Sequence, residues 1–232
     1  MNAHLSPSLA ALFWLAVTLL GYVATRALHR RYRRFWLSPI LLVPVLLFLL
    51  AIPSNTSYAE YARDTGWLIG LLGPATVAFA VPIWEQRALL ARHWPALGAG
   101  MVAGTAMALA SSWLLARSLA LDGEVARSLL PRSITTPFAM EMSRDLGGVP
   151  ELTAAFVMIT GIFGMFGGTL VLRLLPLKTE LARGALFGVG AHGAGTAKAY
   201  ELGSREGSVA GLLMVLTGLF NLLVSPLVAH LL

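Results

Sequence analysis

Long apolar stretches are the feature that most constrains how this chain folds. A helix needs about 18 apolar residues to cross a bilayer, and six stretches approach or exceed this length. They cover residues 8–25, 36–52, 67–84, 96–116, 152–175 and 208–231. Only 12% of all residues are charged, against about 25% in an ordinary soluble domain. The chain is therefore predicted to be an all-α polytopic membrane protein with about six full transmembrane helices, and a soluble single-core fold is excluded.

Two further segments, 120–147 and 178–203, are weaker candidates because their first halves carry charge and their centres are broken. The breaks are a Pro-rich stretch at 131–137 and a Gly-rich stretch at 188–195. Irregular backbone at membrane depth is tolerated only where protein or a watery cavity satisfies its polar groups. A third break is expected within residues 67–84. The residues predicted to break these helices are Gly73, Pro74, Thr76, Pro82 and Pro137.

The two broken segments repeat each other. Residues Thr136–Met142 recur sixty positions later as Thr196–Leu202, so that Glu141 and Glu201 hold the same place. After a three-residue gap the following helices also match, with the same Thr-Gly pair inside each. Residues 178–232 are therefore predicted to repeat 120–176. Paired broken helices in corresponding positions point to the binding site of a transporter.

The charge distribution predicts the topology of the repeats. Five of the 17 basic residues lie in one loop between apolar stretches: Arg26, Arg30, Arg31, Arg33 and Arg34. The positive-inside rule places this loop in the cytoplasm. If segment 120–147 re-enters from outside and segment 178–203 from inside, Lys178 and Arg183 also face the cytoplasm and the repeats are inverted.

Four arginines count against this topology, because it leaves them on the outer side. They are Arg117, Arg127, Arg132 and Arg144. In the alternative topology both weak segments span the membrane, which gives eight crossings and parallel repeats. Re-entry, with an inverted repeat, is the preferred interpretation.

Ionisable residues inside the membrane are costly and therefore mark function. Glu141, Glu201 and His192 are predicted to couple transport to a proton or a sodium ion. The ordinary pKa of histidine, about 6.5, suits such a role. The alternatives are that the two glutamates lie in contact with water near helix ends, and that His192 only bonds loop carbonyls.

Threonines at the start of the predicted half-helices suit an anion. Free N–H groups and the helix dipole favour negative charge there, although the threonines could equally act as caps alone. Lys198 either faces a carboxylate substrate or pairs with Glu201 three residues later. The predicted substrate-binding residues are Thr135, Thr136, His192, Gly193, Gly195, Thr196 and Lys198.

Other kinds of site have no support in the sequence. The chain has no cysteine, and no second ligand lies at metal-binding distance in sequence from His192. No metal, no cofactor and no enzymatic activity are predicted, since no nucleophile stands beside a base. The basic loop lies between membrane segments, so nucleic acid is not an expected partner.

Four motifs resemble the LrgB/CidB family of bacterial membrane proteins. They are Gly-Pro-Ala-Thr-Val-Ala-x-Ala-Val-Pro at 73–82, Thr-Thr-Pro-x-Ala-Met-Glu at 135–141, Gly-Gly-x-Pro-x-Leu-Thr-Ala at 147–154, and His-Gly-x-Gly-Thr-Ala-basic-Ala with Glu-Leu-Gly at 192–203. Lys198 stands where the family is expected to have arginine more often, which keeps the charge but loses bidentate geometry.

The resemblance covers essentially the whole chain after about residue 35. It implies a single LrgB-like transmembrane domain over 1–232 in the bacterial cytoplasmic (inner) membrane. Within this domain, residues 1–52 are expected to hold the N-terminal helices and residues 67–147 the first broken-helix region.

The resemblance implies two functions. The preferred one is ion-coupled secondary transport of small monocarboxylates such as pyruvate, glycolate or glycerate, together with a smaller LrgA/CidA-type partner. The alternative is holin/antiholin-like regulation of murein hydrolases and cell lysis. A structural role in another membrane complex is a third hypothesis, and a homodimer is compatible with each of them.

Overall fold

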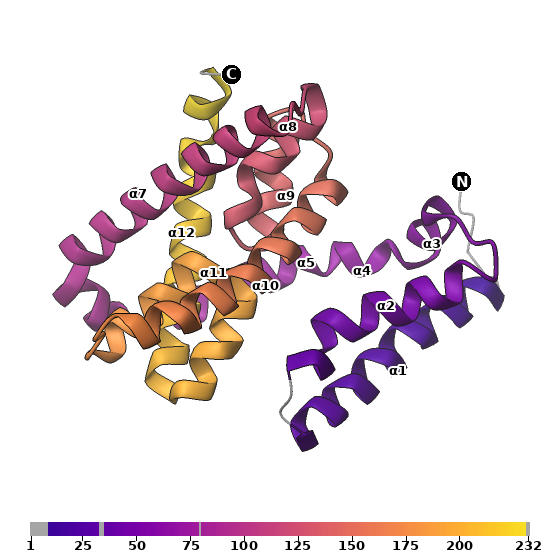
Figure 1. The fold of residues 1–232 in the computed structure, drawn as a ribbon, viewed down its shortest axis with the longest axis horizontal. Helices are drawn as coiled ribbons and strands as arrows, with labels where there is room; N and C mark the ends of the chain where they lie inside the picture. The colour runs from indigo at the N-terminus through magenta and orange to yellow at the C-terminus, as the bar shows by residue number, and fades with distance from the viewer. Residues whose placement is uncertain (1–8, 33–34, 79, 231–232) are drawn as a thin grey trace. The chain divides into compact units, whose positions relative to one another are not determined.

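The computed structural model describes residues 9–32, 35–78 and 80–230 of the chain. All regular elements in these ranges are helices. The chain divides into two compact units, residues 1–75 and 76–232. Figure 1 traces the order of the helices along the chain.

The first unit is built around a long N-terminal helix that packs against the two helices that follow it. Gly21 of the first helix lets the Leu46 side chain of the next one approach closely. Trp14 lies edge-on to the ring of Tyr61, with ring centroids 5.6 Å apart. The helices of this unit are α1 (Leu9–Tyr32), η1 (Phe35–Leu37), α2 (Pro39–Ala51), α3 (Tyr58–Thr65) and α4 (Trp67–Gly70).

The second unit holds the long helices of the C-terminal two thirds of the chain. Its last helix is contacted by α7, α9 and α11 (Figure 1). Phe138, Met142, Val157 and Val215 form the centre of its largest apolar core. The helices after α4 are α5 (Leu72–Ala78), α6 (Ala80–Glu85), α7 (Arg87–Ser118), α8 (Gly123–Leu129), η2 (Leu130–Ser133), α9 (Thr136–Asp145), α10 (Pro150–Leu174), α11 (Glu180–Leu202) and α12 (Ser204–His230).

Four helices among the described residues are long and apolar enough to cross a membrane, namely α1, α7, α10 and α12. The predicted all-α membrane fold is therefore confirmed. The other two predicted spans are shorter than expected. Helix α2 has 13 residues and covers about 20 Å, which is less than the hydrocarbon thickness of about 30 Å.

The predicted span 67–84 is divided into α4, α5 and α6. Pro74 explains the first division, because its ring excludes a helical bond to the carbonyl of Gly70, the residue at which α4 ends. The side chains of Thr76 and Pro82 lie outside the described part of the chain.

Segment 120–147 folds back on itself around η2. Its two arms, α8 and α9, both reach the start of α10, where the Thr153 hydroxyl lies 2.9 Å from the Ser128 carbonyl oxygen and 2.7 Å from the Ser143 hydroxyl. The backbone N–H of Val149 donates to the Ser128 hydroxyl at 2.7 Å. The two ends of the broken segment therefore lie together.

Segment 178–203 is bent at His192. The backbone of this residue has φ 40° and ψ −125°, which no helix contains. A Cβ on Gly195 would overlap the carbonyl oxygen of Phe187, which lies eight residues earlier in the chain. In a straight helix, eight residues would separate these two positions by about 12 Å along the axis. The chain thus turns back after His192, and only glycine fits at position 195.

Candidate functional site

Arg132 carries the most distinctive chemistry in the second unit. It lies in η2, at the break of segment 120–147, and is half-buried. Its guanidinium donates to three hydroxyl groups: Ser112 at 2.9 Å, Ser111 at 3.0 Å and Thr160 at 3.3 Å. None of the ion pairs that the described residues form includes Arg132. Its positive charge is therefore held by neutral groups, an arrangement that leaves it available to an anion.

His192 occupies the break of segment 178–203. It stands sixty positions after Arg132, so the predicted repeat would make the two residues equivalent. The imidazole is 3% exposed, and its Nε2 has no hydrogen-bond partner among the described residues. The element that carries Arg132, η2, is in contact with α11, which carries His192.

Helix α10 joins the two breaks. Thr160 bonds Arg132, and a Cβ on the next residue, Gly161, would lie 3.6 Å from Nδ1 of His192. One turn further, a side chain on Gly164 would strike the backbone of α11 around Ala191. Small residues on α10 therefore let the bend of α11 pack closely against α10, the helix whose Thr160 bonds Arg132.

The two predicted coupling glutamates lie elsewhere, each in an ion pair on its own helix. Glu141 pairs with Arg144, and the Glu201 carboxylate lies 2.6 Å from the Lys198 ammonium. More than half of each glutamate side chain is exposed. Both pairs have i, i+3 spacing. For Lys198 the structure thus shows the pair with Glu201, which was one of the two alternatives. In the described part of the chain, neither glutamate forms a hydrogen bond or an ion pair with Arg132 or His192.

The threonines are placed near the breaks, but none of them caps a helix. Thr135 is the N-cap residue of α9 and its side chain makes no capping bond, while Thr136 begins the helix. The Thr196 hydroxyl lies 3.7 Å from the sulfur of Met214 in α12. A Cβ on Gly193 would meet open space. The first N–H groups of α9 therefore lack a side-chain cap from Thr135, as an anion site would require.

A small pocket with a mostly apolar lining lies beside the first break. Pro131 and Ser133, the two neighbours of Arg132, line it together with residues of α7, α11 and α12. Its enclosed part has room for about one water molecule. A small carboxylate would need the broken segments to move before it could enter here.

Arg132 and the pocket were missed as site residues by the sequence analysis. Arg132 entered it only as a charge that disagreed with the topology. The available signal was the sixty-residue offset, which places Arg132 opposite His192. The polar residues of α7 and α12 gave no signal, because isolated threonines and asparagines are common in any helix.

The comparisons with known proteins agree on one family. The profile of the LrgB-like family matches residues 18–231. The chain is 37% identical to the uncharacterized protein YwbG of Bacillus subtilis, covering 91% of this chain and 94% of the relative. It is 29% identical to the antiholin-like protein LrgB of the same organism, over 100% of this chain and 99% of the relative.

A further relative is the holin-like protein CidB of Staphylococcus epidermidis. It is 25% identical to this chain and is covered over 97% of both lengths. No solved structure matches the chain significantly.

Proposed function

We propose a function from the premise that this chain belongs to the LrgB-like family: it is a multi-pass membrane protein of a holin/antiholin-like system. The names of its relatives, antiholin-like LrgB and holin-like CidB, support control of cell lysis more directly than they support transport. In this function the chain acts in the bacterial inner membrane with a smaller LrgA/CidA-type partner. Transport, the function that the sequence favoured, is therefore the second proposal.

Transport of a small monocarboxylate is the second candidate function, and Arg132 is the observation that favours it. A guanidinium bound only to neutral hydroxyls at a helix break can exchange those bonds for a carboxylate. Hydrogen bonds to charged groups contribute about 1.5–3 kcal/mol each. A family member that only binds partners has no need for such a group within the broken segments.

The proposed site combines both repeats. The guanidinium of Arg132 and the first N–H groups of α9, at Thr135 and Thr136, would hold the carboxylate. His192, with its unbonded Nε2, would respond to the presence of the anion from the second break. In this proposal the two segments re-enter from opposite sides, and Glu141 and Glu201 stay as candidates for coupling at the ends of their arms.

Uptake into proteoliposomes tests the transport proposal. Radiolabelled pyruvate and glycolate are offered to the wild type, to Arg132→Gln and to Arg117→Gln, with and without the smaller partner. Arg117 is a matched control, because it is an exposed arginine that lies over the ring of Trp113 at 4.4 Å. We expect at least a tenfold loss of uptake for Arg132→Gln and wild-type uptake for Arg117→Gln.

The lysis proposal is tested in bacteria from which the genes for this chain and for its smaller partner are deleted. Deletion should change autolysis and the leakage of a dye that is too large for a carboxylate carrier. Absence of wild-type uptake with both substrates and with the partner would refute transport. Unchanged autolysis after deletion of this chain and of its partner would refute the holin/antiholin-like function.

A further inference from the structure

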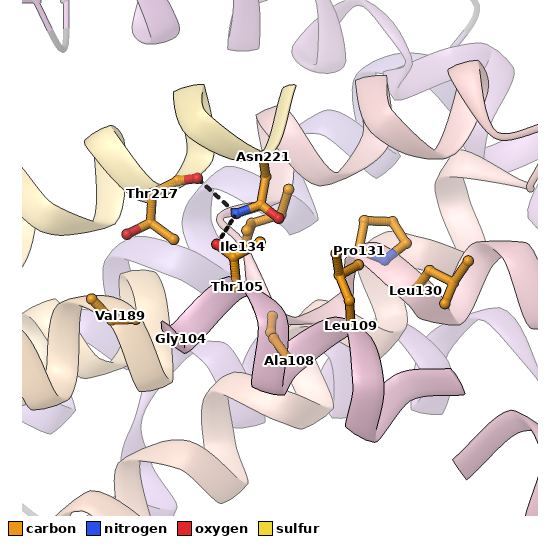
Figure 2. A pocket seen from close by; sticks show the side chains of 11 residues that line it. Gly104, Thr105, Ala108, Leu109, Leu130, Pro131, Ile134, Val189, Thr217 and Asn221 are labelled. Carbon is orange, nitrogen blue, oxygen red and sulfur yellow. Dashed lines mark hydrogen bonds between the residues drawn. The ribbon is translucent and has the colours of Figure 1, made fainter. Parts of the chain in front are cut away.

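The polar side of the pocket beside η2 is organised by Asn221 of α12. This residue is 3% exposed, and its amide donates to the Thr105 hydroxyl at 2.9 Å and to the Thr217 carbonyl at 2.8 Å (Figure 2). The two bonds engage both hydrogens of the amide and fix its orientation. The Oδ1 oxygen, which takes part in neither bond, is left for the pocket that Asn221 lines.

Thr217 gives the independent sign that something occupies this pocket. Its hydroxyl is buried and has no hydrogen-bond partner among the described residues. A buried hydroxyl without a partner costs about 1–3 kcal/mol. Threonines in membrane helices usually bond the carbonyl four residues earlier, as Thr25 and Thr169 do here at 2.7 and 2.8 Å. Thr217 does not make this bond, although it lines the pocket.

The lining provides oxygen atoms without charge. Leu130, Pro131 and Ser133 bring the end of the first arm to the pocket, and the C-terminal end of a helix carries a partial negative charge. The Pro131 carbonyl accepts only a long bond of 3.3 Å from Ile134. Half-helix ends and unwound carbonyls coordinate sodium ions in transporters with broken helices.

These features select the class of ligand. An anion would find a negative helix end and several oxygen atoms, and a divalent cation would lack the carboxylates that usually bind it. A small monovalent cation fits neutral hydroxyl, amide and carbonyl oxygens in a space for about one water molecule. The repeat supports this assignment, since Thr160 in the equivalent position already engages a cation, the guanidinium of Arg132.

We propose that this pocket binds one sodium ion through the oxygens of Thr105, Ser133, Thr217 and Asn221. The ion would fix η2, and thereby Arg132 between Pro131 and Ser133, in the position that receives the carboxylate. This coupling role rests on the proposed transport function. Binding of the ion itself does not, and it can be measured without any substrate.

Binding of ²²Na⁺ to the purified full-length protein in detergent tests the proposal by scintillation proximity. The variants are Thr217→Val, which keeps the shape and removes the hydroxyl, and Thr217→Ser, which restores it. Thr169→Val is the matched control, because it removes a threonine hydroxyl of α10 that bonds only its own helix. We expect saturable binding that weakens at least tenfold in Thr217→Val, while Thr217→Ser and Thr169→Val bind like the wild type.

Two results would overturn the sodium site. One is no saturable binding of ²²Na⁺ by the wild type, which would make the occupant a water molecule. The other is equal binding by Thr217→Val and the wild type. Carboxylate uptake that persists without sodium would leave transport standing and refute the coupling role. Sodium binding without any uptake of carboxylate would support the site and refute transport.

Discussion

Replacing Thr153 by valine tests how segment 120–147 is folded. The side chain of Thr153 is fully buried and lies within hydrogen-bonding distance of Ser128 in α8 and Ser143 in α9. Valine has almost the same shape, so the packing is kept and only the hydroxyl is lost. The Ser128 carbonyl and the Ser143 hydroxyl then lose a buried partner, which should cost about 1–3 kcal/mol of unfolding free energy.

The unfolding free energy can be measured by titrating the detergent-solubilised protein with a denaturing detergent and following helix content. Thr169→Val removes a hydroxyl that bonds only the carbonyl of Met165 in its own helix, and it should change stability by less than about 0.5 kcal/mol. Equal stability of Thr153→Val and Thr169→Val would refute the packing of α8 and α9 on the start of α10. It would favour a segment that runs straight across the membrane.

Three further predictions concern other parts of the chain. Arg132→Lys keeps the charge but loses the planar fork, so we expect carboxylate uptake with a KM raised about tenfold. Gly195→Leu should abolish folded protein in size-exclusion chromatography, because even a Cβ overlaps the Phe187 carbonyl. The N–H and the hydroxyl of Ser57 both donate to the Glu60 carboxylate and lower its pKa. The cap should be formed above the ordinary pKa of Glu60 and be lost as pH falls through the lowered one. Carboxyl NMR titration should show a smaller lowering of this pKa in Ser57→Ala, which keeps the N–H and loses the hydroxyl.

The length and hydrophobicity of the chain predicted its fold class because burial in lipid needs long apolar helices. They did not predict the length of α2. Apolar residues continue beyond the helix to Ile52, but the backbone leaves the helix before Asn55, which has a φ of 52°. The division at Pro74 was readable, since the restriction that proline imposes is local. The length of a helix depends in addition on what its ends pack against.

The site could be predicted only in part, because it too depends on contacts between distant segments. The Pro-rich and Gly-rich stretches indicated both breaks, and the offset that aligns Glu141 with Glu201 also aligns Arg132 with His192. The sequence does not show whether one of these charged side chains contacts neutral hydroxyls or an oppositely charged group. That depends on neighbours from other helices. For Arg132 these are Ser112 of α7 and Thr160 of α10. No local pattern contains such contacts.

The bend at His192 has a consequence for how easily α11 changes shape. A residue with a side chain at φ 40° and ψ −125° is held in a strained conformation that costs about 1–3 kcal/mol. The close approaches of Gly188 to the backbone of Ala210 and of Gly195 to the Phe187 carbonyl hold the chain in this conformation. An energy difference of that size corresponds to a population shift of about 5- to 150-fold, which a single weakly bound small molecule can supply. His192 is thus the position in α11 where the backbone is held farthest from its preferred conformation.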